Sequence, residues 1–305
     1  MRLIYEGRDI TESVNITGAI HHEYSCGRCD CLDITLENAK AWFGWSPKQN
    51  DTLELTQDGY TTGTLYLNAM LPAGDTYRIL ATGAKSGTQK KRWKSYRNMK
   101  LIDLIAENAA ESGLDAGLYG LDGETQYSYL LRRNESAAAF MDRILGYEGA
   151  VMKTAFGRMN GICVKEAQGY EPVARIQLDD MMSAATYTRT ENESYAALTL
   201  ITPYARVTAR DMAKDGNDAL VLTDIPATDE VTQGRWARGM LTMLNRRSEV
   251  LTLVNEFNAG FSAMARIDIE SATDMGGKWI CDEVTHNFID MRSTARMLRC
   301  IETVE

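Results

Sequence analysis

The chain of 305 residues has only three histidines, and this scarcity narrows the chemistry that it can carry. Histidine is the commonest protein ligand of metals and the commonest general base near neutral pH. With His21, His22 and His286 alone, a His-rich metal site or a His-centred catalytic set has little support. Long apolar runs are missing too: none approaches the roughly 18 residues that a membrane-spanning helix needs, so we expect no membrane span. The charged segment at residues 1–10 does not resemble a signal peptide.

Basic side chains are outnumbered by acidic ones. The chain has 33 Lys and Arg against 42 Asp and Glu, a formal net charge of −9. Because an acidic surface repels phosphate, this balance argues against a general binder of nucleic acid or anionic membranes. Hydrophobic residues make up 44% and charged residues 25%, which is typical of a globular protein. The length allows two or three domains with buried cores.

The six cysteines fall into two groups. Cys163, Cys281 and Cys300 are scattered through apolar, strand-like segments, where a free thiol behaves as a small buried hydrophobe. Cys26, Cys29 and Cys31 lie together in one short stretch, and cysteines two residues apart can bind one tetrahedral metal ion. Three thiolates and one imidazole would complete a zinc site there. A second such pair is missing, however, and Cys31 begins an alternating run, so ordinary free thiols are the alternative. We expect no other cofactor.

Alternating hydrophobicity predicts strands through residues 1–83. Apolar residues recur at every second position within 32–36, 53–55, 64–70 and 77–81. Turn residues separate these runs at Asp58-Gly59, Thr62-Gly63 and Pro72-Ala-Gly74. Short turns and a period of two favour an antiparallel sheet or a small barrel. Residues 1–83 are therefore predicted to form a first tube-like β-barrel.

A basic segment follows at residues 84–97. It contains no acidic residue and six basic ones: Lys85, Lys90, Lys91, Arg92, Lys94 and Arg97. Such a run can bind an acidic partner surface, or it can be a solvated connection between domains. We predict a linker here and keep the partner surface as the alternative.

Helical periodicity marks residues 98–170 as a small α+β module. One apolar stripe runs from Leu101 to Ala109, with Asn98 as its expected N-cap and Gly113 as its stop. A second follows Asn134 and includes Phe140 and Met141; its helical spacing indicates core. A hairpin over 150–164 closes the module. Strands then dominate residues 171–305, which are predicted to form a second β-barrel with one inserted helix near 229–245.

The two β-rich parts share an internal repeat. In the first, residues 51–55 are followed by Gly63, the strand 64–70 and the strand 77–81. In the second, residues 266–270 are followed by Gly277, the strand 278–284 and the strand 295–299. The spacing from Leu55 to Gly63 equals that from Ile269 to Gly277. The fold class predicted is therefore α+β and predominantly β, with two similar antiparallel barrels flanking the module.

Three segments resemble a known family. They are the opening 3–14 with the run 32–37 and Trp42, the hairpin-like pair 50–55 and 62–67, and the segment 127–145 that enters a helix. The chain resembles the tail hub family of bacteriophages, the late control protein D group. Its relatives include the baseplate hub of contractile tails and the hub part of the type VI secretion spike. The cysteine cluster departs from the polar loop that this family has there.

The resemblance implies a homotrimer whose two barrels per chain form a pseudo-hexameric ring. This ring would join a six-fold tail tube protein to a three-fold spike protein in the tail of a virion or phage-like particle assembled in the bacterial cytoplasm. DNA could pass through an acidic lumen without being held. The resemblance does not distinguish a phage from a prophage remnant or a tail-like bacteriocin, nor a contractile tail from another kind.

Two other functions are weighed against this one: a cytoplasmic hydrolase-type enzyme and a different tail adaptor protein. The pairs Asp179-Asp180 and Asp282-Glu283 offer carboxylates for acid–base chemistry, but neighbours in a strand point to opposite faces. Residues 215–218 lack the spacing of a calcium loop, and His286 has no nucleophile motif beside it. We therefore expect no catalytic residues and no enzymatic activity.

Overall fold

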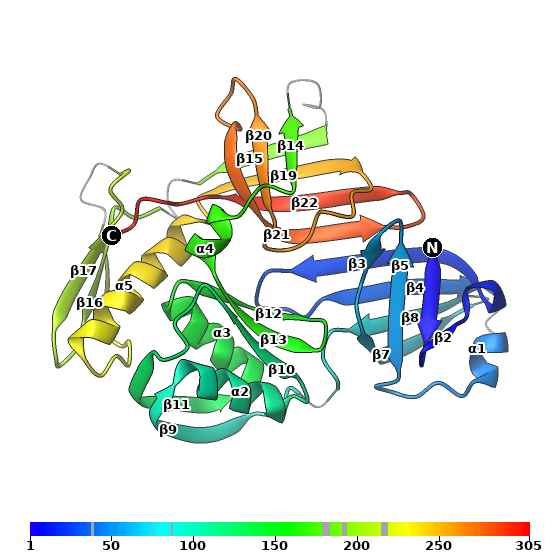
Figure 1. Cartoon of the computed structure of the whole chain (residues 1–305), viewed down its shortest axis with the longest axis horizontal. Helices are drawn as coiled ribbons and strands as arrows, with labels where there is room; N and C mark the ends of the chain where they lie inside the picture. Colours follow the sequence, from blue (N-terminus) through cyan, green and yellow to red (C-terminus); the bar gives the residue numbers. More distant parts are fainter. Residues whose placement is uncertain (38–39, 75, 87, 179–183, 191–193, 215–218) are drawn as a thin grey trace.

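The computed structural model describes residues 1–37, 40–74, 76–86, 88–178, 184–190, 194–214 and 219–305. Most of its regular structure is strand, as expected, and the strands form one large sheet and three small ones. Figure 1 shows the N-terminal strands, the small α+β module and the C-terminal strands arranged around a common centre. No helix in these described residues is long and apolar enough to cross a membrane.

The N-terminal strands form a six-stranded antiparallel unit in the order β3-β4-β8-β7-β5-β1. Its alternate side chains, among them Leu32, Ile34 and Leu53, fill an apolar core to which Trp42 of the short helix α1 also contributes. Short strands β2 and β6 pair with β1 and β5. The elements are β1 (Arg2–Tyr5), β2 (Arg8–Asp9), a 3₁₀ turn (Thr11–Ser13), β3 (Asn15–Tyr24), β4 (Cys31–Glu37), α1 (Lys40–Gly44), β5 (Thr52–Gln57), β6 (Tyr60–Thr61), β7 (Leu65–Ala73) and β8 (Thr76–Thr82).

The C-terminal strands form a matching unit in the order β15-β19-β22-β21-β20-β14. All its pairs are antiparallel except β14 with β20. Its core contains Leu251, Leu253, Trp279 and Met297. The strands are β14 (Ala174–Gln177), β15 (Ala185–Arg189), β19 (Glu249–Glu256), β20 (Arg266–Glu270), β21 (Gly277–Asn287) and β22 (Arg292–Arg299).

The internal repeat is confirmed as a repeated three-stranded meander. Strands β5, β7 and β8 pair in sequence, as do β20, β21 and β22. In each copy a glycine with positive φ precedes or opens the middle strand, Gly63 at +65° and Gly277 at +127°. Glycine is suited to both positions because it has no Cβ to clash in this conformation.

The prediction of two closed barrels differs from what the described strands form. The C-terminal half of β21 pairs with β3, with His286 opposite His21 and Glu283 opposite Tyr24. This pairing joins both units into one 14-stranded sheet, whose path through the described residues ends at β15 and β2 without closing. The alternation of apolar and polar residues predicts which face of a strand is buried. It does not predict which strands pair at their edges, so it cannot distinguish a closed barrel from an open sheet.

The module packs two helices against two small sheets. The apolar faces of these two helices are buried as predicted, with Leu104 of the first and Phe140 and Leu145 of the second in the core. Strand β9 lies mostly within the segment predicted as a linker, residues 84–97, and pairs with β11 as a two-stranded ribbon. The elements are β9 (Arg92–Lys100), α2 (Leu101–Glu111), β10 (Asp115–Tyr119), β11 (Gln126–Glu135), α3 (Ala137–Tyr147), β12 (Ala150–Ala155), β13 (Arg158–Cys163) and α4 (Val164–Gly169), with the second sheet ordered β10-β13-β12.

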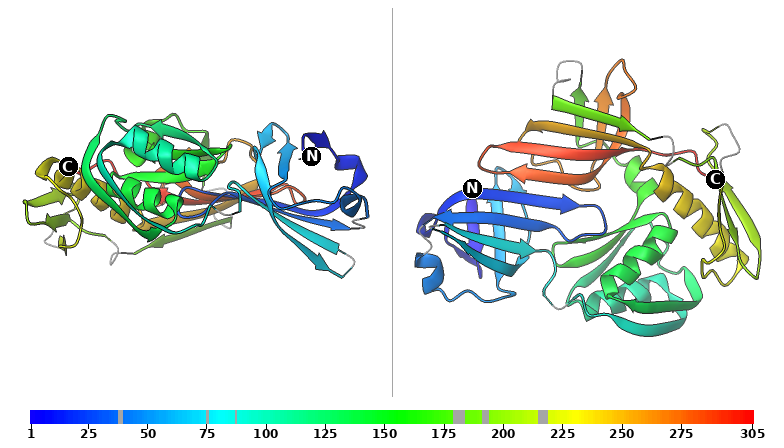
Figure 2. Two further views of the ribbon diagram at one scale, coloured as in Figure 1. Left: turned by 90° about the horizontal axis from the view of Figure 1, so that it is seen from below. Right: turned by 180° about the vertical axis from the view of Figure 1, so that it is seen from behind.

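The inserted helix is confirmed as α5 (Glu230–Asn245). It packs against a three-stranded sheet of β16 (Ala197–Ile201), β17 (Arg206–Arg210) and β18 (Ala219–Leu222), and against α3. Trp236 and Leu241 share the apolar core of the module. Both views in Figure 2 agree with Figure 1 in placing α5 beside the module. The helix thus connects the C-terminal residues to the module through a shared core.

Helix caps lie close to the predicted positions, but not at them. Asn98, the expected cap of the first helix, and Asn134, the residue expected to precede the second, lie in strands with φ of +48° and +53°. The N-cap positions of α2 and α3 are Lys100 and Ser136, and Ser136 Oγ accepts a hydrogen bond from the backbone N of Ala139. Both asparagines satisfy the preference of this residue type for left-handed conformations rather than for capping.

The cap of α5 leads to a first prediction. Asp229 accepts hydrogen bonds from the backbone N of Thr232 at 2.8 Å and from its hydroxyl at 2.9 Å. Asp229→Ala leaves this donor unpaired, so we expect a loss of about 1 kcal/mol in the free energy of unfolding, measured by urea titration. The exposed Asp224→Ala is the matched control, expected to change stability by less than about 0.5 kcal/mol. Equal effects of the two substitutions would show that the cap contributes nothing.

Candidate functional site

A buried ionic cluster lies where the module meets the large sheet. Lys153 is on β12, Glu23 is on β3, and Asp30 lies in the loop between β3 and β4. The ammonium of Lys153 lies 3.1 Å from Glu23 Oε2 and 2.9 Å from Asp30 Oδ2. All three residues are buried, with exposed fractions of 4–7%. A charge in this environment is tolerated only when it is paired and hydrogen-bonded.

Glu23 extends the cluster to both β units. It accepts hydrogen bonds from the hydroxyl of Tyr60 at 2.6 Å and from the backbone N of Ala263 at 3.1 Å. One carboxylate therefore contacts the module, the N-terminal unit and the loop between β19 and β20. We refer to Glu23, Asp30, Lys153 and Tyr60 as the ionic junction.

The charges of the ionic junction depend on one another. Burial raises the pKa of Asp30 to about 6, despite the opposing attraction of Lys153. Burial also acts to raise the pKa of Glu23, but the ammonium of Lys153 and the hydrogen bond from the Tyr60 hydroxyl lower it. Burial disfavours the ammonium of Lys153, yet the two carboxylates outweigh it and raise its pKa. The junction is thus stable as a set and costly to leave with any one member missing.

Two of the three histidines are buried beside the ionic junction. His21 Nδ1 lies 2.6 Å from the hydroxyl of Tyr60, and burial lowers its pKa to about 3. His286 Nδ1 lies 2.9 Å from Ser293 Oγ, and its Nε2 lies 2.9 Å from the carbonyl oxygen of Phe261. Both rings are neutral near pH 7 and enclosed by aromatic side chains, so they are structural groups and not an accessible acid–base pair.

The three clustered cysteines are not gathered into one ligand set. Cys26 packs against an apolar cluster that includes Val151 and Met264, Cys29 lies beside Thr154, and Cys31 lies beside Tyr24. Burial raises the pKa of all three thiols. Across the described ranges, no group of three or more His, Cys, Asp or Glu has a geometry that could hold a metal ion.

This placement predicts the metal content of the protein. We expect chain purified from zinc-supplemented cells to contain far less than one zinc per molecule by plasma mass spectrometry. Cys29→Ser should leave that content unchanged. One zinc per chain, lost in Cys29→Ser, would support the zinc site and contradict the structural placement of these thiols.

Of the two carboxylate pairs weighed from the sequence, only Asp282-Glu283 lies within the described residues, and Asp282 has structural partners. Asp282 accepts a hydrogen bond from Ser25 Oγ at 2.6 Å and pairs with Arg246 and Arg296. These contacts anchor the loop after β3 to β21, which is a structural role. Asp179-Asp180 and residues 215–218 lie outside the described residues.

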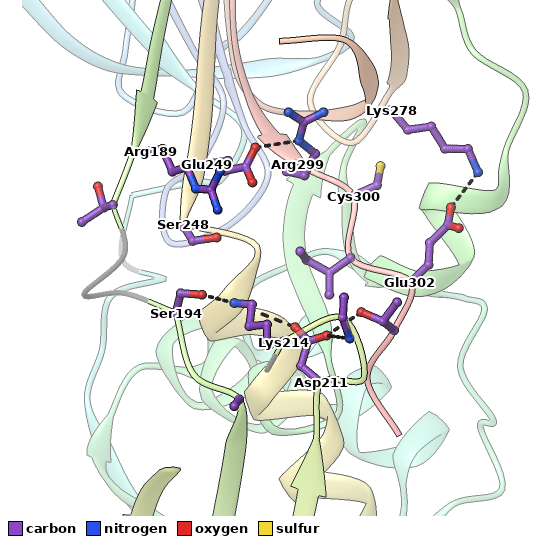
Figure 3. Close-up of a pocket in the computed structure, with 15 residues that line it drawn as sticks. Arg189, Ser194, Asp211, Lys214, Ser248, Glu249, Lys278, Arg299, Cys300 and Glu302 are labelled. Carbon is purple, nitrogen blue, oxygen red and sulfur yellow. Dashed lines mark hydrogen bonds and ion pairs between the residues drawn. The ribbon is translucent and has the colours of Figure 1, made fainter. Parts of the chain in front are cut away.

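A polar pocket of about 690 Å³ lies between the C-terminal unit and the sheet that contains β17 (Figure 3). Two ion pairs lie in its wall, Arg299 with Glu249 at 2.8 Å and Lys278 with Glu302 at 2.7 Å, and Arg189 lines it as well. Burial raises the pKa of the Cys300 thiol in its wall to about 12, so that this thiol is a poor nucleophile. The lining brings one hydroxyl to an amine: the Lys214 ammonium donates a hydrogen bond to Ser194 Oγ and also lies 3.9 Å from Asp211 Oδ2.

Sequence reasoning did not single out the ionic junction. The only signal was Lys153, a lone charge within the apolar strand Ala150–Ala155. Such a residue indicates a buried partner, but nothing in the sequence names Glu23 or Asp30, which lie more than 120 residues away.

Comparisons with known proteins show which solved structures share this fold. No protein-family model matches the chain, and no curated protein matches its sequence. Solved structures do match. A 43 kDa tail protein of prophage MuSo2 from Shewanella oneidensis has a TM-score of 0.76 at 11% identity, covering 100% of this chain and 99% of that one. A tail protein from Neisseria meningitidis has a TM-score of 0.74 at 11% identity, with 99% and 97% covered.

A third match extends beyond phages. A component of the type VI secretion system from Escherichia coli has a TM-score of 0.60 at 11% identity, covering 99% of this chain and 78% of that one. Agreement over nearly the whole chain at such low identity is a likeness of fold. The resemblance predicted from the sequence is confirmed at this level: the chain has the fold of phage tail proteins and of a type VI secretion component.

Proposed function

We propose that this chain is the structural hub of a phage or phage-like tail. Three copies form a ring that connects the six-fold tail tube to the three-fold spike. The observation that carries the proposal is the duplicated six-stranded unit, β3-β4-β8-β7-β5-β1 and β15-β19-β22-β21-β20-β14. Two similar units per chain, in three chains, present six similar surfaces to a six-fold partner and three to a three-fold one.

Exposed apolar side chains supply contact surface for such a ring. Phe43 and Leu71, at the N-terminal unit, are 54% and 46% exposed. Obligate assemblies usually bury more than about 2,000 Å² per interface and are rich in such side chains. The net charge of −9 suits a lumen through which DNA passes without being held. The particle would be a tail of the late control protein D type, assembled in the bacterial cytoplasm and acting in a contractile injection system.

The site geometry favours this role over an enzymatic one. Both buried histidines are enclosed, and in the polar pocket Arg299 and Lys278 are paired with Glu249 and Glu302. The proteins that share the fold are described as tail or secretion components, which points away from catalysis. A tail adaptor at another position in the particle is the second candidate, since it could use the same fold.

Coexpression tests the proposal and separates the candidates. The chain is produced together with the tube and spike proteins encoded beside it. The molar mass of the complex is then measured by size-exclusion chromatography with light scattering. The proposal predicts three copies of the 34.0 kDa chain, about 102 kDa together, bound to both partners. A complex with only one of the two partners, or with six or twelve copies of this chain, would contradict the hub and favour the adaptor.

A further inference from the structure

The β9–β11 ribbon carries an exposed face that the proposed ring does not explain. Within the part of the chain that the structure describes, the two strands pair only with each other, and one face packs on the module through Tyr96, Tyr127 and Leu130. In Figure 1 and in the rear view of Figure 2, this ribbon curves around the outer side of the module, away from β14 and β20. Its other face points to solvent.

Three cross-strand pairs make up the outward face. Trp93 lies opposite Arg133, Ser95 opposite Leu131, and Arg97 opposite Tyr129. Trp93 is 70% exposed and Tyr129 is 38% exposed, while Leu131 between them is partly buried. Tryptophan, tyrosine and arginine are the residue types that carry most binding energy in protein interfaces. We call these six residues the ribbon face.

Charge on the ribbon is strongly positive, in contrast to the chain as a whole. Residues 90–100 and 126–135 contain eight basic side chains and one acidic one, Glu135, in a protein of net charge −9. The inward cations are neutralised: Lys94 pairs with Glu107 and Glu111, and the buried Arg132 lies 2.8 Å from Glu111. Among the described residues, neither Arg97 nor Arg133 forms an ion pair.

From this arrangement we infer that the ribbon face is a docking surface for an acidic segment of another protein. The two free guanidinium groups would pair with carboxylates, and exposed Lys90 and Lys91 would extend the positive surface at one end. Trp93 and Leu131 provide an apolar centre with a charged rim, the usual anatomy of a protein interface. A long nucleic acid would also meet the acidic remainder of the surface, whereas a short acidic segment would not.

A binding assay on the full chain tests the inference. The probe is a fluorescein-labelled peptide with the repeat Glu-Glu-Leu, titrated by fluorescence anisotropy at low salt, and its Gln-Gln-Leu counterpart reports contacts that need no charge. We expect the double variant Arg97→Glu, Arg133→Glu to bind the acidic peptide about tenfold more weakly or worse, and Trp93→Ser about fivefold more weakly. Because these side chains point outward, thermal unfolding of both variants should match that of the wild type.

Matched variants separate the ribbon face from general charge. Arg206→Glu with Arg210→Glu alters two exposed arginines on β17 and changes the net charge equally, and Tyr204→Ser removes an aromatic that is 67% exposed. Both should bind within about twofold of the wild type. The inference is overturned if these controls weaken binding as much as the ribbon variants, or if the wild type does not bind the peptide. It is also overturned if an oligothymidylate strand binds more tightly than the peptide and competes with it.

Discussion

Lys153→Met is expected to lower the free energy of unfolding by about 3–5 kcal/mol at pH 7.5, because it leaves two buried carboxylates without their cation. Glu23 and Asp30 both lie within 3.1 Å of the Lys153 ammonium. Methionine fills much of the volume of the lysine stem, so the effect isolates charge from packing. The junction holds the module against the large sheet, and its loss should affect the whole fold.

The pH dependence of this variant identifies the cause. In the wild type, the folded pKa of Asp30, about 6, is above its usual 3.8. Between these values the native state holds a proton that the unfolded chain lacks, so the contribution of Asp30 to stability increases as the pH falls. Glu23 has the opposite sign: its lowered pKa gives stability that is lost as the pH falls below its usual 4.5. Without Lys153 both carboxylic acids should protonate more readily, so the deficit of Lys153→Met should shrink between pH 7.5 and 5.

Urea titrations at pH 7.5 and pH 5, followed by tryptophan fluorescence, measure both effects. Lys165→Met removes an exposed lysine from α4 and should change stability by less than about 0.5 kcal/mol. Adding Asp30→Asn to Lys153→Met should restore part of the loss at pH 7.5. An equal deficit at both pH values would mean that packing, and not the unpaired charge, causes it.

Gly239→Ala is expected to destabilise the protein by about 2–3 kcal/mol, even though alanine favours a helix more than glycine does. A Cβ at Gly239 would lie 2.2 Å from the carbonyl oxygen of Tyr147 and 2.4 Å from the backbone N of Gly149. These are backbone atoms, which cannot rotate away. The α5 helix therefore approaches the end of α3 at a distance that only glycine permits.

The clash would also disturb a buried hydrogen-bond network at the same contact. Glu148 accepts hydrogen bonds from Trp236 Nε1 at 2.7 Å, the Tyr127 hydroxyl at 2.8 Å and Arg235 Nε at 2.8 Å. Moving α5 outward would strain all three bonds to a carboxylate that has little contact with water.

Gly234→Ala is the matched control on the same helix. The nearest atoms to a Cβ at Gly234 are 3.8 Å away, an ordinary contact. This variant should be neutral or more stable by up to about 1 kcal/mol, because alanine has the better helix propensity. Thermal melts of the two variants side by side provide the measurement. A neutral Gly239→Ala would contradict the close packing of α5 against the module.

The elements of the fold that local pattern specifies could be predicted from the sequence. Alternation identified the strands around Leu32, Leu53 and Ile267, and glycine spacing identified the repeated meander. The β9–β11 ribbon was not predicted, because β9 has a single deeply buried side chain, Tyr96, and the basic run from Lys90 to Lys94 breaks the alternation of apolar and polar residues. Open or closed sheets could not be distinguished, since β3 meets β21 through backbone groups that every sequence has.

The site was harder to predict for a related reason. The partners of Lys153 come from β3 and the loop after it, and their proximity depends on how the module docks. Cys26, Cys29 and Cys31 have the spacing of a metal site, but strand β4 and the turn before it direct them to separate surroundings. Local spacing gives the ligand types, while burial and backbone direction decide whether they meet.

Electron microscopy of the parent particle tests the central claim most directly. With a small tag on this chain marking its position, the proposed hub predicts three copies between the tube and the spike, with six similar β units arranged around the lumen. Finding the tagged chain at the outer baseplate, along the tube or in the spike itself would contradict the hub. A copy number other than three at the junction would do so as well.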